Sequence, residues 1–318
     1  MPDPSTRPTE SEPLRPTLRF APSPNGRLHL GHALSALRNR RMADRLGGRL
    51  LLRIEDIDPG RCTPELERAL LDDLRWLGIA FDGPAIRQSE NGARHRAALD
   101  RLRGAGLAYP AFLSRREVRA IVAAAPDWPR DPDGAPHYPA VERDLDPAEA
   151  ARRIARGEPH AWRLDMARAA ERSGPLLWTE VDERGAAVLR VRADPPAWGD
   201  VVLARVDAPA AYHLAATVDD AAEGVTHVVR GRDLFRATAV HRLLQRLLGL
   251  PEPLYHHHGL VTLDGRKLAK SRQRGEPCDL ALHALRAAGL SPGGARAALD
   301  EPVPGGTTPP QASAARRR

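Results

Sequence analysis

The stretch from Arg19 to His32 constrains the fold most, since it reads as a strand, a tight turn and the start of a helix. The turn contains two prolines and the pair Asn25-Gly26, and a periodic apolar segment then predicts a helix from about Leu30 to a stop at Gly47-Gly48. A strand that turns directly into a helix points unpaired backbone N–H groups and the positive end of the helix dipole at its loop. We therefore predict that this loop binds a phosphate group.

Two histidines lie at the start of this helix. His29 and His32 are three residues apart and fall on one face of its first turn, with Gly31 between them to allow a close approach of the backbone. Imidazole donors at a helix N-terminus suit the negative charge that grows during phosphoryl or nucleotidyl transfer. The motif His-x-Gly-His alone is equally compatible with an ordinary surface helix, so its interpretation depends on the string around it.

The composition indicates a polyanionic partner. The 318 residues carry a net charge of +7 and a pI near 10.1, which favours nucleic acid as partner or substrate. The two cysteines, Cys62 and Cys278, match no zinc or redox spacing, so we expect a reducing, cytoplasmic setting. No apolar run approaches the length of a membrane span, and we expect no membrane partner.

The lysines of the chain lie in one segment. Of 48 basic residues only Lys267 and Lys270 are lysine, and both belong to the run Gly-Arg-Lys-Leu-Ala-Lys-Ser. Lysine is a compact charge on a flexible stem that can follow a moving phosphate, whereas arginine is a planar fork. This confinement to one loop favours a catalytic role for both lysines over the alternative of two solvated side chains.

Charged residues at the ends of predicted strands indicate a second part of the site. The apolar run Arg49–Asp58 predicts a parallel strand whose C-terminal end faces a cleft, where Glu55 can hold an ammonium group. Three further strands are expected in the same sheet, at Asp200–Val206, Tyr212–Val218 and Val225–Val229. Arg230 follows the last of them, and a guanidinium buried there requires an anion. Such a pocket suits a dicarboxylic amino acid such as glutamate.

The pattern of elements predicts an α/β fold with a parallel sheet that is interrupted by an inserted α+β subdomain. A disordered leader precedes it, and a lysine-loop and helical segment and a flexible basic tail follow. The expected ranges, in this order along the chain, are 1–17 for the leader, 18–106 for the first half of the main domain, 107–196 for the insertion, 197–250 for the second half, 251–300 for the lysine-loop and helical segment, and 301–318 for the tail.

Five segments in this order together resemble the catalytic core of the class I glutamyl-tRNA synthetases. They are Arg19–Gly26, His29–His32, Arg53–Asp58, Val229–Leu234 and Lys267–Ser271. The resemblance extends from about Leu18 to Leu290 and implies the Rossmann-like core of that class. Within it, the chain is most similar to the short branch that attaches glutamate to the queuosine base of aspartate tRNA. Only 47 residues follow Ser271, too few for the helical anticodon-binding domain of a full synthetase.

The resemblance implies a ligase that forms glutamyl-adenylate from L-glutamate and ATP, with Mg²⁺, and passes the glutamyl group to the anticodon stem-loop of tRNA(Asp). We expect a monomer. The glutamate site that the resemblance implies consists of Arg19, Phe20, Ala21, Pro22, Ser23, Glu55, Tyr212 and Arg230. The ATP site that it implies consists of His29, Gly31, His32 and Lys270.

One departure from the family concerns zinc. The family commonly holds zinc in the insertion through three cysteines and a tyrosine, whereas the matching positions here are Ala111, Leu113, Tyr138 and Glu142. We therefore predict no structural zinc and no other metal site, since the consecutive His256–His258 point to alternate sides of an extended segment. The insertion is then expected to depend on its apolar residues, among them Tyr109, Phe112, Ile121 and Trp128.

Three other functions are compatible with parts of the sequence. They are a catalytic-only synthetase that charges a tRNA 3′ end, a non-catalytic tRNA-binding paralogue, and a nucleotidyltransferase for small molecules. The intact histidine and lysine motifs argue against the second. The third leaves the predicted glutamate pocket and the basic charge unexplained.

Replacement of Lys270 by alanine is expected to reduce the rate of glutamate activation on the order of a hundredfold or more, because a fixed cation that stabilises the leaving pyrophosphate is lost. The measurement is glutamate-dependent exchange of labelled pyrophosphate into ATP. A variant that retains the wild-type exchange rate would exclude this role for Lys270.

Overall fold

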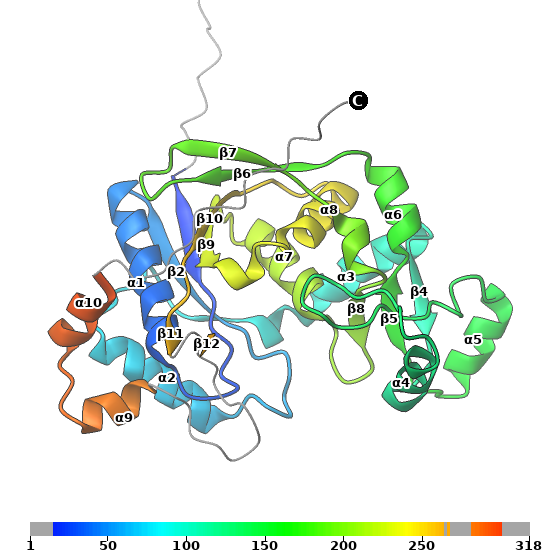
Figure 1. The fold of residues 1–318 in the computed structure, drawn as a ribbon, viewed down its shortest axis with the longest axis horizontal. Helices are drawn as coiled ribbons and strands as arrows, with labels where there is room; N and C mark the ends of the chain where they lie inside the picture. Colours follow the sequence, from blue (N-terminus) through cyan, green and yellow to red (C-terminus); the bar gives the residue numbers. More distant parts are fainter. Residues whose placement is uncertain (1–14, 264–265, 268–280, 301–318) are drawn as a thin grey trace, which may run out of the picture.

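The computed structural model describes residues 15–263, 266–267 and 281–300 (Figure 1). Within these residues the main sheet has seven strands in the order β3-β2-β1-β9-β10-β6-β7. Its strands are β1 (Thr17–Phe20), β2 (Arg49–Ile54), β3 (Ile86–Arg87), β6 (Leu177–Val181), β7 (Ala187–Arg192), β9 (His227–Gly231) and β10 (Leu254–His258). Neighbouring strands are parallel except for the β6–β7 pair, so the predicted α/β class is confirmed.

The first unit of the sheet is the predicted strand, loop and helix. α1 (Leu30–Arg45) begins at the predicted residue and connects β1 to β2, which pair in parallel with Leu18 opposite Leu50. On its other side β1 pairs with β9, so the order of strands along the chain reverses at β1. Ligands of open α/β sheets bind in the crevice that such a reversal leaves at the carboxyl ends of the strands.

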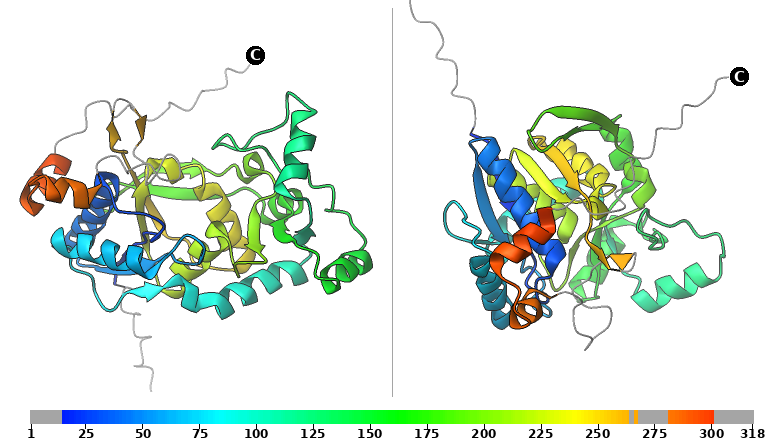
Figure 2. Two further views of the ribbon diagram at one scale, coloured as in Figure 1. Left: turned by 90° about the horizontal axis from the view of Figure 1, so that it is seen from below. Right: turned by 60° about the vertical axis from the view of Figure 1, so that its left-hand side comes forward.

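Helices cover both faces of the sheet, as the two views of Figure 2 show. The core on one face includes residues of α1, α2 (Pro64–Trp76), α9 (Leu282–Ala287) and α10 (Pro292–Asp300). The core on the other face includes residues of α3 (Gly92–Gly104), α6 (Met166–Ser173), α7 (Tyr212–Ala222) and α8 (Thr238–Leu248). Consecutive residues of β9 point to opposite faces of the sheet. Val228 packs in the core with α7 and α8, and Val229 packs in the core with α1.

The strand predicted at Tyr212–Val218 is wrong, because these residues form the first turns of α7. The helix buries an unbroken run from Leu214 to Asp220, so its polar face, which would reveal a helical period, is missing from the sequence. This correction matters for the site. It places Tyr212 in the first turn of a helix and Asp220 two turns later.

The expected boundaries of the insertion do not coincide with the division between the sheets. β4 (Ala108–Ala111), β5 (Ala161–Leu164) and β8 (Val202–Arg205) form a separate antiparallel sheet, beside α4 (Arg115–Ala123) and α5 (Pro147–Ala155). β8 was expected in the main sheet, whereas β6 and β7, within the expected insertion, belong to it. Local sequence predicts a strand but does not specify the sheet that it joins. In the structure, Trp178 of β6 is buried in the main core.

The ends of the described chain refine the other boundaries. The last residues of the expected leader are ordered, because Thr17 belongs to β1 and the Arg15 guanidinium donates to the Gly48 carbonyl at 3.1 Å. Residues 1–14 and the tail 301–318 lie outside the described residues. The remaining elements are β11 (Thr262–Leu263), β12 (Arg266–Lys267) and the 3₁₀ turns η1 (Gln88–Asn91), η2 (Pro195–Trp198) and η3 (Arg232–Leu234). In the described ranges, no helix combines the length and apolarity that crossing a membrane requires.

A buried carboxylate occupies the position where the sequence resemblance would place a zinc site. Glu142 is 5% exposed; its Oε1 accepts from the backbone N–H groups of Phe112 and Leu113, both at 3.0 Å, and its Oε2 accepts from the Tyr138 hydroxyl at 2.7 Å. The Arg163 guanidinium lies over the Tyr138 ring. These groups offer no thiolate and satisfy one another, so they do not fit a tetrahedral zinc site.

The insertion therefore depends on more than its apolar residues. Tyr109 and Phe112 are buried as expected, but Ile121 and Trp128 are only half-buried. The Tyr109 hydroxyl in addition donates to Asp200 at 2.6 Å. Polar contacts between distant segments thus supplement a small apolar core.

Replacement of Glu142 by alanine is expected to lower the free energy of unfolding by about 2–4 kcal/mol, because two backbone N–H groups and a phenol lose a buried charged acceptor. Thermal or urea unfolding measures it, with the exposed Glu171→Ala as matched control. Metal analysis of the purified wild type is expected to find no stoichiometric zinc. Bound zinc, or an unchanged unfolding midpoint in the Glu142 variant, would contradict this account.

Candidate active site

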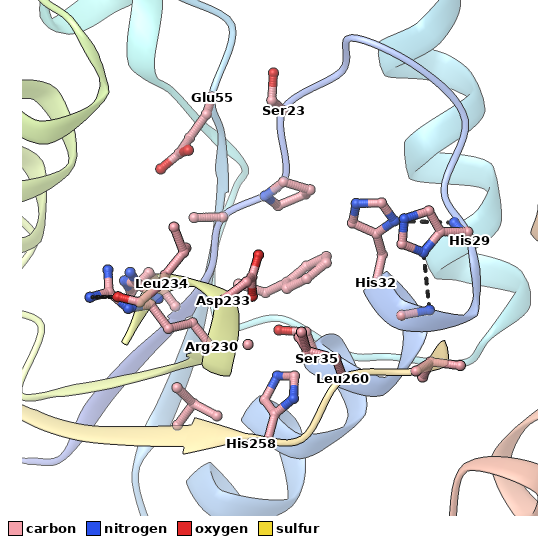
Figure 3. Close-up of a pocket in the computed structure, with 18 of the residues that line it drawn as sticks. Ser23, His29, His32, Ser35, Glu55, Arg230, Asp233, Leu234, His258 and Leu260 are labelled. Atoms are coloured by element: carbon pink, nitrogen blue, oxygen red, sulfur yellow. Dashed lines mark hydrogen bonds between the residues drawn. The ribbon is translucent and has the colours of Figure 1, made fainter. Parts of the chain in front are cut away.

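A cavity of about 590 Å³ opens at the carboxyl ends of β1, β2, β9 and β10 (Figure 3). Every residue predicted for the glutamate site lines it, namely Arg19, Phe20, Ala21, Pro22, Ser23, Glu55, Tyr212 and Arg230. His29, Gly31 and His32 line the same cavity. Lys267 lies in the β11–β12 hairpin, and Lys270 lies outside the described residues. The structure thus brings eleven predicted site residues around one space.

The two histidines cap the N-terminus of α1. His29 Nδ1 accepts from the Gly31 N–H, and His32 Nδ1 accepts from the His29 N–H, both at 3.1 Å. Acceptance at Nδ1 leaves the ring proton on Nε2, so each imidazole presents one N–H donor away from the helix. The ring centroids are 3.8 Å apart. The site therefore places two adjacent imidazoles on the cavity wall, with their planes tilted by 40°.

This arrangement corrects one detail of the sequence interpretation. The N–H groups of His29 and Gly31 do not point unpaired into the loop, because the imidazoles accept them. Gly31 is required for a related reason. A Cβ at this position would lie 2.9 Å from Cε1 of His29, so only glycine leaves room for the capping ring.

Arg19 already has a carboxylate partner in the structure. Its Nε donates to Asp220 Oδ1 at 2.8 Å, and Arg53 Nη1 donates to the same oxygen at 2.7 Å. Arg53 is fully buried and also pairs with Glu55 and Glu223. Burial acts against its charge, but these carboxylates raise the pKa of Arg53 well above its ordinary value. The group joins β1, β2 and α7 at the floor of the cavity.

The carboxylates of this group differ in how easily they ionise. Burial raises the pKa of Glu55, against the opposing effect of Arg53 and Arg19. Burial also raises the pKa of Glu223 to about 6. Asp220 contacts two guanidiniums, which hold its pKa below the ordinary value despite burial. Glu55 points into the cavity in Figure 3, so it is the acid best placed to gain from a bound cation.

Arg230 has no carboxylate within 4 Å among the described residues, although it is only 5% exposed. Its guanidinium donates to neutral partners, which are Thr238 Oγ1 at 2.7 Å, His241 Nδ1 at 3.0 Å, His257 Nε2 at 3.1 Å, the Leu234 carbonyl at 3.2 Å and the Tyr212 hydroxyl at 3.5 Å. An unneutralised buried cation at a cavity wall is a receptor for an anion.

Several residues around the cavity were missed by sequence reasoning. Asp220 was assigned to no role, although a pair of aspartates inside an apolar segment indicates buried ion pairs. His257 was considered only as part of a histidine run. The strand alternation expected for that run is confirmed, since His256 contacts the Val181 carbonyl and His257 contacts Arg230. No group of three or more metal-ligating side chains gathers in the part of the chain that the structure describes.

Comparison with known proteins identifies the family. Residues 17–278 match the model of the "tRNA synthetases class I (E and Q), catalytic domain". The chain is 48% identical over 276 residues to the glutamyl-Q tRNA(Asp) synthetase of Rhodobacter capsulatus, covering 86% of this chain and 96% of that protein. It is 44% identical to the protein of that name from Nocardia farcinica, covering 79% and 75%.

Solved structures show the same fold. A glutamate tRNA ligase from Elizabethkingia meningosepticum, in complex with its amino acid, superposes with a TM-score of 0.67 at 28% identity. The match covers 83% of this chain and 54% of that one, so the chain spans about half the length of that ligase. The chain thus belongs to the class I tRNA synthetases (E and Q) and is a ligase of that family.

Proposed function

We propose that this protein activates L-glutamate with ATP and transfers the glutamyl group to the queuosine base in the anticodon of tRNA(Asp). The observation that carries the glutamate half is Arg230, a buried cation without a carboxylate partner among the described residues, at the wall of a cavity that also reaches His29 and His32. One end of the cavity suits a carboxylate, and the other suits a nucleotide phosphate.

The amino acid fits between three groups of the cavity. The side-chain carboxylate of glutamate is expected at Arg230 and Tyr212, where the bond between them is the longest that the guanidinium makes, 3.5 Å. Its ammonium group is expected at Glu55, whose raised pKa a neighbouring cation would lower. Arg19, already paired with Asp220, serves more as a wall of the site than as the receptor of a free carboxylate.

The α-carboxylate then faces the nucleotide end. One of its oxygens forms a bond to the α-phosphorus of ATP while the bond from that phosphorus to the pyrophosphate oxygen breaks. The Nε2–H donors of His29 and His32 are placed to stabilise the charge on the phosphate oxygens, and Mg²⁺ accompanies ATP as part of the substrate. This step needs no nucleophile from the protein.

The relatives support the proposed acceptor. Proteins named glutamyl-Q tRNA(Asp) synthetase match this chain at 48% and 44% identity, and the first is covered over 96% of its length. A second candidate is transfer to a tRNA 3′ end. It is favoured by the glutamate–tRNA ligase 2 of Methylobacterium, which is 39% identical but covered over only 58% of its length. The net charge of +7 is compatible with either acceptor.

The acceptor is tested with labelled glutamate, ATP and tRNA(Asp) with and without queuosine. We expect label only on the queuosine-containing tRNA, and unchanged label after the 3′-terminal adenosine is removed, because the base then carries the glutamyl group. Trimming in this way is preferable to periodate, which also attacks a diol on the base. Label on tRNA(Glu) that disappears with its 3′ adenosine would instead establish the second candidate.

The affinity for glutamate is expected to fall as the pH is lowered. Below its raised pKa, Glu55 is protonated and no longer attracts the ammonium group, so the KM for glutamate rises as the pH is lowered from neutral into the acid range. Glu223, with a pKa of about 6, adds to the loss as it is protonated beside Arg53. The KM for ATP is the internal control. In Glu55→Gln the glutamate KM is expected to be high and flatter with pH, and a wild-type KM independent of pH would refute the assignment.

A further inference from the structure

Arg230 differs from the other buried arginines of the site in the kind of group that satisfies its N–H donors. Arg19 and Arg53 share Asp220, whereas Arg230, one strand away in the sheet, makes its hydrogen bonds only with uncharged groups. A buried guanidinium ordinarily costs several kcal/mol unless it is paired, so its five N–H donors must be satisfied in another way. Two imidazoles supply much of that satisfaction.

His257 is held as an acceptor by a carboxylate behind it. Its Nδ1 contacts Glu180 Oε1 at 2.8 Å, and its Nε2 accepts from Arg230 Nε at 3.1 Å. A carboxylate can only accept, so the ring proton lies on Nδ1 and Nε2 is free of it. The His257 side chain is 1% exposed, and Glu180 also accepts from Trp178 Nε1 at 2.7 Å. Glu180 thereby fixes both the tautomer and the orientation of the imidazole that faces Arg230.

His241 forms a second support on the other side of the guanidinium. Its Nδ1 accepts from Arg230 Nη1 at 3.0 Å, and its Nε2 lies 3.2 Å from His213 Nδ1. The proton is therefore on Nε2 and is donated to His213. Thr238 completes the support, since its hydroxyl accepts from Nη2 at 2.7 Å. Three neutral acceptors on α8 and β10 thus orient the Arg230 guanidinium.

The electrostatics keep these imidazoles uncharged. Burial, together with the nearby Arg230 cation, lowers the pKa of His213 to about 4 and that of His241 well below its ordinary value. Burial also lowers the pKa of His257 to about 4, even though Glu180 acts in the opposite direction. At neutral pH the supports therefore accept hydrogen bonds without adding or cancelling charge.

We propose that His257, fixed by Glu180, and His241, fixed by His213, are positioning residues that hold Arg230 as an unneutralised cation and so make the site select a substrate side chain that bears a carboxylate. This inference rests on the proposed activation of glutamate and adds the residues that determine its specificity. A carboxylate in place of either imidazole would satisfy the same N–H groups but neutralise the receptor. A neutral substrate such as glutamine gains much less from the cation than glutamate does.

The first test compares His241→Glu with His241→Gln, two side chains of one shape that differ in charge. In pyrophosphate exchange we expect His241→Gln to keep the glutamate KM within a few-fold of wild type, and His241→Glu to raise it by about a hundredfold. The KM for ATP is expected to stay within about twofold in both, and the preference for glutamate over glutamine to shrink only in His241→Glu. Equal effects of the two substitutions on the glutamate KM would overturn the proposal.

The second test removes the acceptor from His257. His257→Leu is expected to raise the glutamate KM about tenfold or more, and His257→Gln, which restores a neutral acceptor, to return it toward wild type. His256→Leu is the matched control, since His256 lies on the opposite face of the same strand and contacts the Val181 carbonyl. A structural role would instead change the KM for ATP and the thermal midpoint together and show no rescue by glutamine, which would refute positioning.

The proposed function and this inference are separated by different experimental results. A wild-type protein that shows no glutamate-dependent exchange overturns the proposed function and this inference together. A wild type that activates glutamate, with variants whose glutamate KM does not depend on the charge at position 241 or the acceptor at position 257, overturns this inference alone.

Discussion

The shared ion pair at Asp220 is the interaction on which the rest of the site depends. One carboxylate oxygen accepts from Arg19 of β1 and Arg53 of β2, at 2.8 and 2.7 Å, while Asp220 itself belongs to α7. All three side chains are largely buried, and loss of Asp220 would leave Arg19 without the carboxylate that neutralises it. The pair therefore locks the helix to the carboxyl edge of the sheet. Tyr212, two turns earlier on that helix, is fixed over the cavity as a result.

The two arginines of the pocket have different tasks because their surroundings differ. Arg19 is neutralised within the protein and contributes mainly to architecture. Arg230, which lines the cavity, donates to a hydroxyl, a carbonyl and two imidazoles and has no carboxylate partner among the described residues. A single fixed cation in a site of low polarity distinguishes a carboxylate from a carboxamide far better than a network of paired charges does. Under the proposed function, the absence of a carboxylate partner among the described residues would make Arg230 selective for a substrate carboxylate.

The insertion illustrates how one organising group can replace another. Where the family pattern has thiolates, this chain has a buried carboxylate, Glu142, that gathers two backbone N–H groups and the hydroxyl of Tyr138. This carboxylate ties the residues that follow the strand Ala108–Ala111 to a segment some thirty residues later in the chain. The carboxylate does so through hydrogen bonds that need no metal ion.

The sequence by itself determined the strand, loop and helix around His29, the cavity residues carried by short motifs, and the α/β class, because turn residues, caps and apolar runs act over a few neighbouring positions. It did not reveal that Tyr212 begins a helix, because α7 is buried along its middle and its polar face is absent. The sheet that β6 or β8 joins was decided by tertiary packing. So was the pairing of Arg19 with Asp220 and of Arg230 with His257, since these partners are 201 and 27 residues apart and meet only once the sheet is assembled.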